Sequence, residues 1–216
     1  IIMPLQGSTQ WDALSHVYYD GQLYNGYPAS AVNSFGATKD SIDQVAGQGL
    51  ITTRGVLLDV AHHRRVKYLP PQTVISPEDL EETAKAEGVS VEPGDVVIVR
   101  TGWRVNFLET RDGEAWAINS PGLSWRCAEW LHNKQAAAVA SDNIAVEVFR
   151  SEFEEAALVF HLLTIRDMGM MLGEIWDLEA LSQDCAQDGA YAFLLAAQPL
   201  RFSGAVGSPV NPVAIK

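Results

Sequence analysis

The sequence has 216 residues, of which 47% are hydrophobic and 19% are charged, and its formal net charge is −12. The length fits one compact domain, and the acidic balance argues against binding to nucleic acid or to an anionic membrane surface, since both need clustered Lys and Arg. Cys127 and Cys185 form no CxxC pair, and no apolar run approaches the roughly 20 residues of a membrane span. We therefore expect a cytoplasmic protein with no nucleic acid or membrane partner.

No linker, repeat or low-complexity tract interrupts the chain, so we expect a single domain over residues 1–216. The sequence starts at Ile1 rather than Met, and its chemically richest segment lies close to that start. We therefore also expect that this domain can belong to a longer protein with residues before Ile1.

The first half of the chain predicts loops, two buried strands and one well-marked helix. Residues 1–30 are rich in Gly, Gln, Tyr and Asn and predict turns. The apolar runs at 55–60 and 96–99 predict buried strands. Between them, Ser76 as N-cap, Pro77 as first residue and Gly88 as stop predict a helix. The basic run 62–65, which contains two histidines, directly follows a strand, so we interpret it as a solvated turn rather than a metal or phosphate site.

The second half continues the alternation of helices and strands. We expect a helix from a cap at Ser124, a strand over 136–140, a helical face over 153–163, closing strands at 191–197 and 201–202, and an extended tail from Gly204. This order indicates a mixed α/β domain.

The densest set of chemical groups lies in the segment Gln6-Gly7-Ser8-Thr9-Gln10-Trp11-Asp12-Ala13-Leu14-Ser15-His16. If the segment is extended, Gln6, Gln10, Asp12 and His16 share one face, because side chains alternate along a strand. Amide oxygens, a carboxylate and an imidazole on one face suit a hard metal ion or a substrate. A polar edge strand or turn explains the same spacing, and the spacing alone leaves both interpretations open.

This segment resembles the signature of the cyclase family, which includes kynurenine formamidases and isatin hydrolases. The signature reads His-x-Gly-Thr-His-x-Asp, followed by another His. Asp12 and His16 match it, whereas Gln6 and Gln10 replace two histidines and Ser8 replaces the glycine. Further similar stretches follow in order at 54–59, 93–103, 121–123, 141–143 with Glu147, 161–178 and 207–212.

The resemblance implies the swivelling β/β/α, cyclase-like α/β fold, a mixed, barrel-like sheet flanked by helices. It also implies a small-molecule substrate and a homodimer or homotetramer. No sequence pattern independent of the resemblance predicts the oligomer.

The resemblance further implies the residues of the site. A divalent metal ion would be held by Gln6, Gln10, Asp12, His161 and Glu174, and the catalytic residues would be His16 and Glu174. His161 and Glu174 enter because the family carries a helical His followed by a Glu beside the metal. Without the family, a core histidine and a solvated charge are the favoured explanations of these two residues.

Three aromatic residues are expected to contact the substrate: Trp11, Tyr24 and Trp103. Trp11 is the strongest of them because it lies inside the signature segment. Each of the three is otherwise ordinary core material.

Gln6 and Gln10 affect which metal ion the site would bind. Family members bind Zn²⁺ or Mn²⁺ through imidazoles and a carboxylate, and an amide oxygen is a weaker, harder ligand. We expect Mn²⁺ or Zn²⁺, with Mg²⁺ or Ca²⁺ as alternatives. Binding through His16 or His161 instead, and the absence of any metal, both remain open.

The resemblance implies a metal-dependent hydrolase of a small cyclic or aryl amide, lactam or lactone, with His16 as general acid and base. Hydrolysis of an amide would place it among enzymes acting on carbon–nitrogen bonds, as formamidases do. Two alternatives stay open: a metal-independent lyase, dehydratase or cyclase acting on a small carbonyl compound, and a catalytically inactive ligand-binding homologue.

Overall fold

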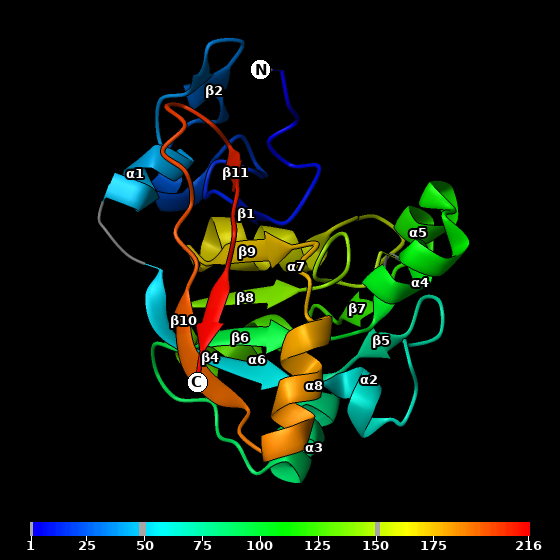
Figure 1. Ribbon diagram of the computed structural model, residues 1–216. Coiled ribbons are helices and arrows are strands. Elements are labelled where there is room, and N and C mark those ends of the chain that lie inside the picture. Colours follow the sequence, from blue (N-terminus) through cyan, green and yellow to red (C-terminus); the bar gives the residue numbers. More distant parts are fainter. Residues whose placement is uncertain (1, 48–50, 150–151) are drawn as a thin grey trace.

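The computed structural model describes residues 2–47, 51–149 and 152–216. Its centre is a mixed eight-stranded sheet with the order β11-β1-β9-β8-β6-β4-β10-β12 (Figure 1). The four inner strands run parallel: β4 (Thr52–Leu58), β6 (Val96–Val99), β8 (Ala138–Ser141) and β9 (Met171–Glu174). Antiparallel strands flank them: β1 (Gln10–Asp12), β11 (Gly207–Pro209), β10 (Ala192–Ala196) and β12 (Val213–Ile215).

Two small sheets and a set of mostly short helices complete the described residues. The small sheets pair β2 (Val32–Asn33) with β3 (Gly36–Ala37), and β5 (Val74–Ile75) with β7 (Gly122–Leu123). The α-helices are α1 (Ile42–Gly47), α2 (Val60–His63), α3 (Pro77–Glu87), α4 (Trp103–Thr110), α5 (Gly113–Ile118), α6 (Cys127–Asn133), α7 (Val159–His161) and α8 (Glu179–Asp188). Two 3₁₀ turns (Tyr24–Gly26 and Ala29–Ala31) lie near the start, and a π-helix (Leu162–Asp167) continues α7.

The sheet separates two apolar layers. Strand residues alternate between the two faces, so Val97 and Val99 pack on one side and Val96 and Ile98 on the other. The first layer is covered by α3, α6 and α7, and the second by α1 and α8. Helices on both faces explain why β6 is apolar without interruption.

The helix predicted from Ser76 forms as expected. The Ser76 hydroxyl accepts the Asp79 N–H at 3.2 Å, and the Asp79 carboxylate accepts the Ser76 N–H at 2.8 Å, which completes a capping box. Gly88 ends the helix in the left-handed conformation, with φ of 66°.

The structure confirms the mixed α/β layout and the strands expected near 55–60, 96–99, 136–140 and 191–197, and the helix expected after Ser124 begins at Cys127. The helical face expected over 153–163 is wrong for its first part. Leu158 has φ of 54°, which a continuous α-helix does not accommodate, so α7 begins only at Val159. Residues 201–202 form no strand, whereas the tail supplies β11 and β12.

The basic run 62–65 is exposed as expected, although its two histidines end the short helix α2 and only its two arginines lie in the turn that follows. In the described residues, no helix has the length and apolar character needed to cross a membrane.

Candidate functional site

The polar residues near the start of the chain converge, although only Gln10–Asp12 form a strand. Within β1, Gln10 and Asp12 point to the side of the sheet where α7 lies, and Trp11 points to the opposite core. Gln6 reaches the same point from the turn before β1, and His16 reaches it from the bend after the strand.

Amide groups connect this segment to the neighbouring strand. Gln6 Nε2 donates to Asp12 Oδ1 at 2.7 Å and lies 2.8 Å from His16 Nδ1. Gln10 Nε2 donates to Glu174 Oε2 at 2.8 Å and to Asp12 Oδ1 at 3.2 Å. The strand register explains the contact between Gln10 and Glu174, because the antiparallel pairing of β1 with β9 sets these two residues directly opposite each other.

His161 approaches the same carboxylates from the last residue of α7. Its Nε2 lies 3.3 Å from Glu174 Oε1 and 4.0 Å from Asp12 Oδ2, and its Nδ1 lies 2.5 Å from Glu147 Oε1. All four side chains are buried. The π-helix that begins at the next residue is the kind of helix irregularity often found at functional sites.

Burial and crowding shift the pKa values of this cluster. Burial, followed by the nearby charge of Asp12, raises the pKa of Glu174 to about 7. Burial alone would lower the pKa of His161, but hydrogen bonds to Glu147 and Glu174 outweigh it and raise that pKa to about 10. Burial lowers the pKa of His16 despite the charge of Asp12, so His16 is neutral at pH 7.

The cluster has the chemistry of a divalent-cation site. With its three carboxylates ionised and His161 protonated, the buried group carries a charge of −2, which is costly without a counter-charge. Asp12 Oδ2 and Gln10 Oε1 are buried and have no hydrogen-bond partner. Asp12, His16 and His161 also offer ligand atoms that lie within 4.8 Å of one another. These residues therefore fit a bound divalent ion.

The predicted aromatic contacts are distributed differently. Trp11 is fully buried on the far side of the sheet, where its Nε1 donates to Ala197 O at 2.8 Å, so its position does not favour a substrate contact. Trp103 is also buried, with its Nε1 donating to Trp116 O at 2.7 Å. Tyr24 packs against Gly169, which lies just beyond the π-helix that follows His161.

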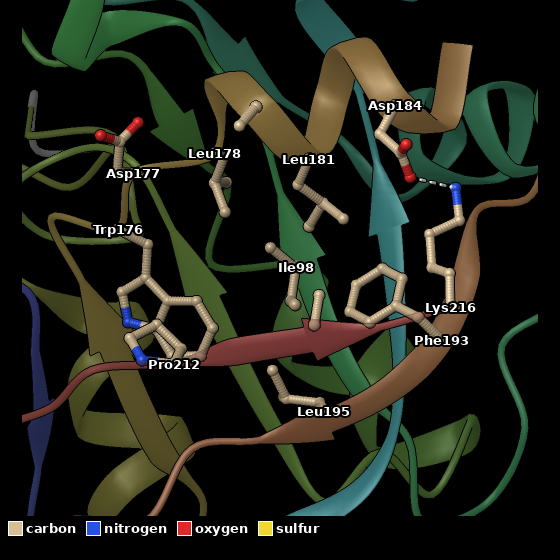
Figure 2. Close-up of a pocket in the computed structure, with 12 residues that line it drawn as sticks. Ile98, Trp176, Asp177, Leu178, Leu181, Asp184, Phe193, Leu195, Pro212 and Lys216 are labelled. Carbon is tan, nitrogen blue, oxygen red and sulfur yellow. Dashed lines mark ion pairs between the residues drawn. The ribbon is translucent and has the colours of Figure 1, made fainter. Parts of the chain in front are cut away.

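A separate hollow of about 460 Å³ lies on the opposite face of the sheet, between α8, β10 and β12 (Figure 2). Its lining is mixed: Trp176, Phe193 and Leu195 are apolar, and the ion pair of Lys216 with Asp184, at 2.9 Å, lies at one end. None of the cluster's carboxylates or imidazoles lines it. This hollow is therefore not the candidate site.

The sequence predicts six of the seven converging residues, namely Gln6, Gln10, Asp12, His16, His161 and Glu174, but gives no role to the seventh, Glu147. Glu147 was matched only as part of a similar stretch, although it is the nearest partner of His161 Nδ1. Its contact crosses an irregular loop, and the available signal was only an acidic residue following a predicted buried strand.

Comparisons with known proteins show what the chain is similar to. A family model described as "Putative cyclase" matches residues 1–148. The chain is similar to a crystal structure of a novel cyclase, with 42% identity and a TM-score of 0.90, and the match covers 100% of this chain and 71% of that chain. A search of curated proteins finds no match.

Two more distant structures share the fold. An isatin hydrolase bound to the product analogue thioisatinate has 19% identity and a TM-score of 0.71, over 98% of this chain and 72% of that one. A potential metal-dependent hydrolase with cyclase activity has 17% identity and a TM-score of 0.59, over 98% of this chain and 79% of that one. The expected cyclase-like fold, a mixed barrel-like sheet flanked by helices, is thereby confirmed.

Proposed function

The chain belongs to the cyclase family, and on that premise we propose that it is a metal-dependent hydrolase of a small cyclic or aryl amide, lactam or lactone. Hydrolysis as the reaction is supported by the isatin hydrolase and the potential metal-dependent hydrolase among the structures that share its fold. Mn²⁺ and Zn²⁺ are the metals we favour, because imidazole nitrogen is present beside carboxylate oxygen.

The observation that carries this proposal is the buried oxygen Asp12 Oδ2. It has no hydrogen-bond partner and faces His161 Nε2 at 4.0 Å, with Glu174 Oε1 close to the same nitrogen. A buried carboxylate oxygen without a donor is costly, and a cation held by these residues would remove that cost. We assign Asp12, His161 and Glu174 as the residues that hold the ion, with the free oxygen of Gln10 as a further ligand.

A divalent ion held there would polarise a substrate carbonyl and lower the pKa of a bound water. The protein itself provides proton transfer. His16 is neutral at pH 7 and sits beside the cluster, which suits a general acid and base. Gln6 must turn its amide nitrogen toward Asp12 Oδ1, since its oxygen there would repel the carboxylate, and the same nitrogen then donates to His16 Nδ1. His16 consequently carries its proton on Nε2, from which it can be donated to a leaving group. To accept a proton at Nδ1, His16 must first break its hydrogen bond with Gln6.

Metal analysis combined with an activity screen tests the proposal. We expect the purified protein to contain a divalent transition metal, to lose hydrolysis of aryl amides, lactams or lactones on chelation, and to regain it with added Mn²⁺ or Zn²⁺. His16→Ala should abolish turnover while the fold and the metal content persist. Undiminished turnover in that variant would remove His16 from the mechanism.

One observation favours a second candidate, a metal-independent lyase or dehydratase. The amide N–H groups of Gln6 and Gln10 already give Asp12 Oδ1 two donors, and so take over part of the role of a cation. The pKa of Glu174, at about 7, also lets the cluster hold a proton in place of a metal. A metal-free protein whose activity is insensitive to chelator would favour this candidate over the hydrolase.

A further inference from the structure

Glu147 caps the N-terminus of α7, the helix that carries His161. It is buried, its Oε1 accepts the His161 N–H at 2.9 Å, and its Oε2 accepts the Phe160 N–H at 3.2 Å. The first N–H groups of any helix lack partners within the helix, so this carboxylate caps α7 from a different segment of the chain. Glu147 thus fixes where the backbone of His161 lies.

The same carboxylate also contacts the ring. Glu147 Oε1 lies 2.5 Å from His161 Nδ1. Because an ionised carboxylate can only accept, Nδ1 must carry a proton, and a neutral ring then has its lone pair on Nε2. Nε2 is the nitrogen that faces Asp12 and Glu174. One side chain thus sets the position, the ring orientation and the tautomer of His161.

The backbone before Glu147 is strained and tightly held. Val146 has φ of 56°, a conformation that is costly for a β-branched residue. Asn143 stabilises it, since its Oδ1 accepts the Val146 N–H at 2.8 Å and its Nδ2 donates to Val146 O at 3.2 Å. On the other side, a Cβ on Gly122 would lie 2.3 Å from the Glu147 carbonyl carbon. Such strain persists only where the surroundings over-determine it, and here it directs Glu147 at His161.

We infer that Glu147 is a positioning residue, which holds His161 with Nδ1 protonated and presents Nε2 to the divalent ion. The inference rests on the proposed function in one respect, the divalent ion that Nε2 would bind. Histidine ligands are commonly held in this way by a carboxylate on the second ring nitrogen, and loss of such a carboxylate typically weakens metal binding by about 10- to 100-fold.

Glu147→Gln tests the inference, because it keeps an oxygen acceptor for the helix while it removes the charge. The matched control is Glu152→Gln. Glu152 also holds a loop and a helix start, accepting from the Ser124 hydroxyl at 2.9 Å and from the Trp125 N–H at 3.0 Å, but it does not contact His161. Zn²⁺ affinity is measured by calorimetry on the metal-free proteins, and folding is checked by thermal melting. We expect Zn²⁺ to bind Glu147→Gln about 10- to 100-fold more weakly and to bind the control as it binds the wild type.

NMR of ¹⁵N-histidine-labelled protein gives a readout that a purely structural role would not move. In the wild type, His161 should show a low-field proton on Nδ1 with or without Zn²⁺, and this proton should move or disappear in Glu147→Gln. Wild-type protein without that proton, or a variant with unchanged Zn²⁺ affinity, would overturn the inference even if melting temperatures fall. If wild-type protein shows the proton but binds no Zn²⁺, the metal-dependent function fails while the positioning of His161 stands.

Discussion

Glu87, at the end of α3, should make the stability of this protein depend on pH. Its Oε1 accepts the Asp59 N–H at 3.0 Å, while its Oε2 is buried without a hydrogen-bond partner. Burial first, and the nearby charge of Asp59 second, raise the pKa of Glu87 from 4.5 to about 8. The native protein therefore keeps a proton that the unfolded chain releases, and its stability should fall as the pH rises from 4.5 to 8.

The size of the effect follows from linkage. Each pKa unit corresponds to about 1.4 kcal/mol, so the shift from 4.5 to about 8 gives an upper limit of about 5 kcal/mol. Glu87 is only half-buried, and solvent screening reduces the expected cost to about 2 kcal/mol. Glu87→Gln resembles the protonated side chain and keeps an acceptor for the Asp59 N–H. The variant should be more stable than wild type by about 2 kcal/mol at pH 9, with little difference at pH 4.5.

Urea unfolding at several pH values between 4.5 and 9 measures this difference, with the free energy of unfolding extrapolated to water. Glu82→Gln is the control, because Glu82 is an exposed glutamate on the same helix and loses the same formal charge. A stability difference for Glu87→Gln that stays constant across the pH range, or that is matched by Glu82→Gln, would refute the reasoning.

Three further changes have defined outcomes. Arg100→Met should lower the free energy of unfolding, measured by urea unfolding, by about 3–5 kcal/mol. Buried Arg100 contacts the carboxylates of Glu179 and Asp59 at 2.8 and 2.9 Å, and both would lose this partner. Gly169→Ala should lower melting temperature more than Gly189→Ala, since both glycines have positive φ but only at Gly169 would a Cβ meet Tyr24, at 2.4 Å. Trp11→Phe should cost about 1–3 kcal/mol through its lost hydrogen bond and leave KM unchanged, and a raised KM at unchanged stability would make Trp11 a substrate contact.

The parts of the fold that sequence predicted are those set by local chemistry. The helix after Ser76 carries its own cap, first-turn proline and terminal glycine, and the apolar strand at 96–99 needs no distant information to be buried. The edge strands β11 and β12 differ, because short extended segments become strands only through their partners. The apolar periodicity over 153–163 predicts a helix there, but Leu158 interrupts it in the left-handed conformation. A leucine gives no indication of that conformation in the sequence.

The candidate site likewise combines residues that local sequence predicts with residues whose positions depend on distant parts of the chain. Asp12 and His16 could be proposed from the segment that holds them, but the approach of His161 and Glu174 depends on the pairing of β1 with β9 and on the entry of α7. The placement of Trp11 was available from the sequence. Residues adjacent along a strand point to opposite faces, so a strand that directs Asp12 to the cluster must direct Trp11 away from it.

The two glutamines explain how this site can differ from one built with histidines. An imidazole can offer a lone pair to a metal, whereas Gln6 and Gln10 direct amide nitrogens to Asp12 Oδ1 at 2.7 and 3.2 Å. These donors satisfy one oxygen of Asp12 and leave Oδ2 without a hydrogen-bond partner, as the oxygen that the proposed cation would meet. The demand for positive charge is thereby confined to the side of Asp12 that faces His161 and Glu174. Compared with the family signature, these two positions thus lack imidazole on one side of the carboxylate, while the imidazole of His161 and the carboxylate of Glu174 lie on the other side.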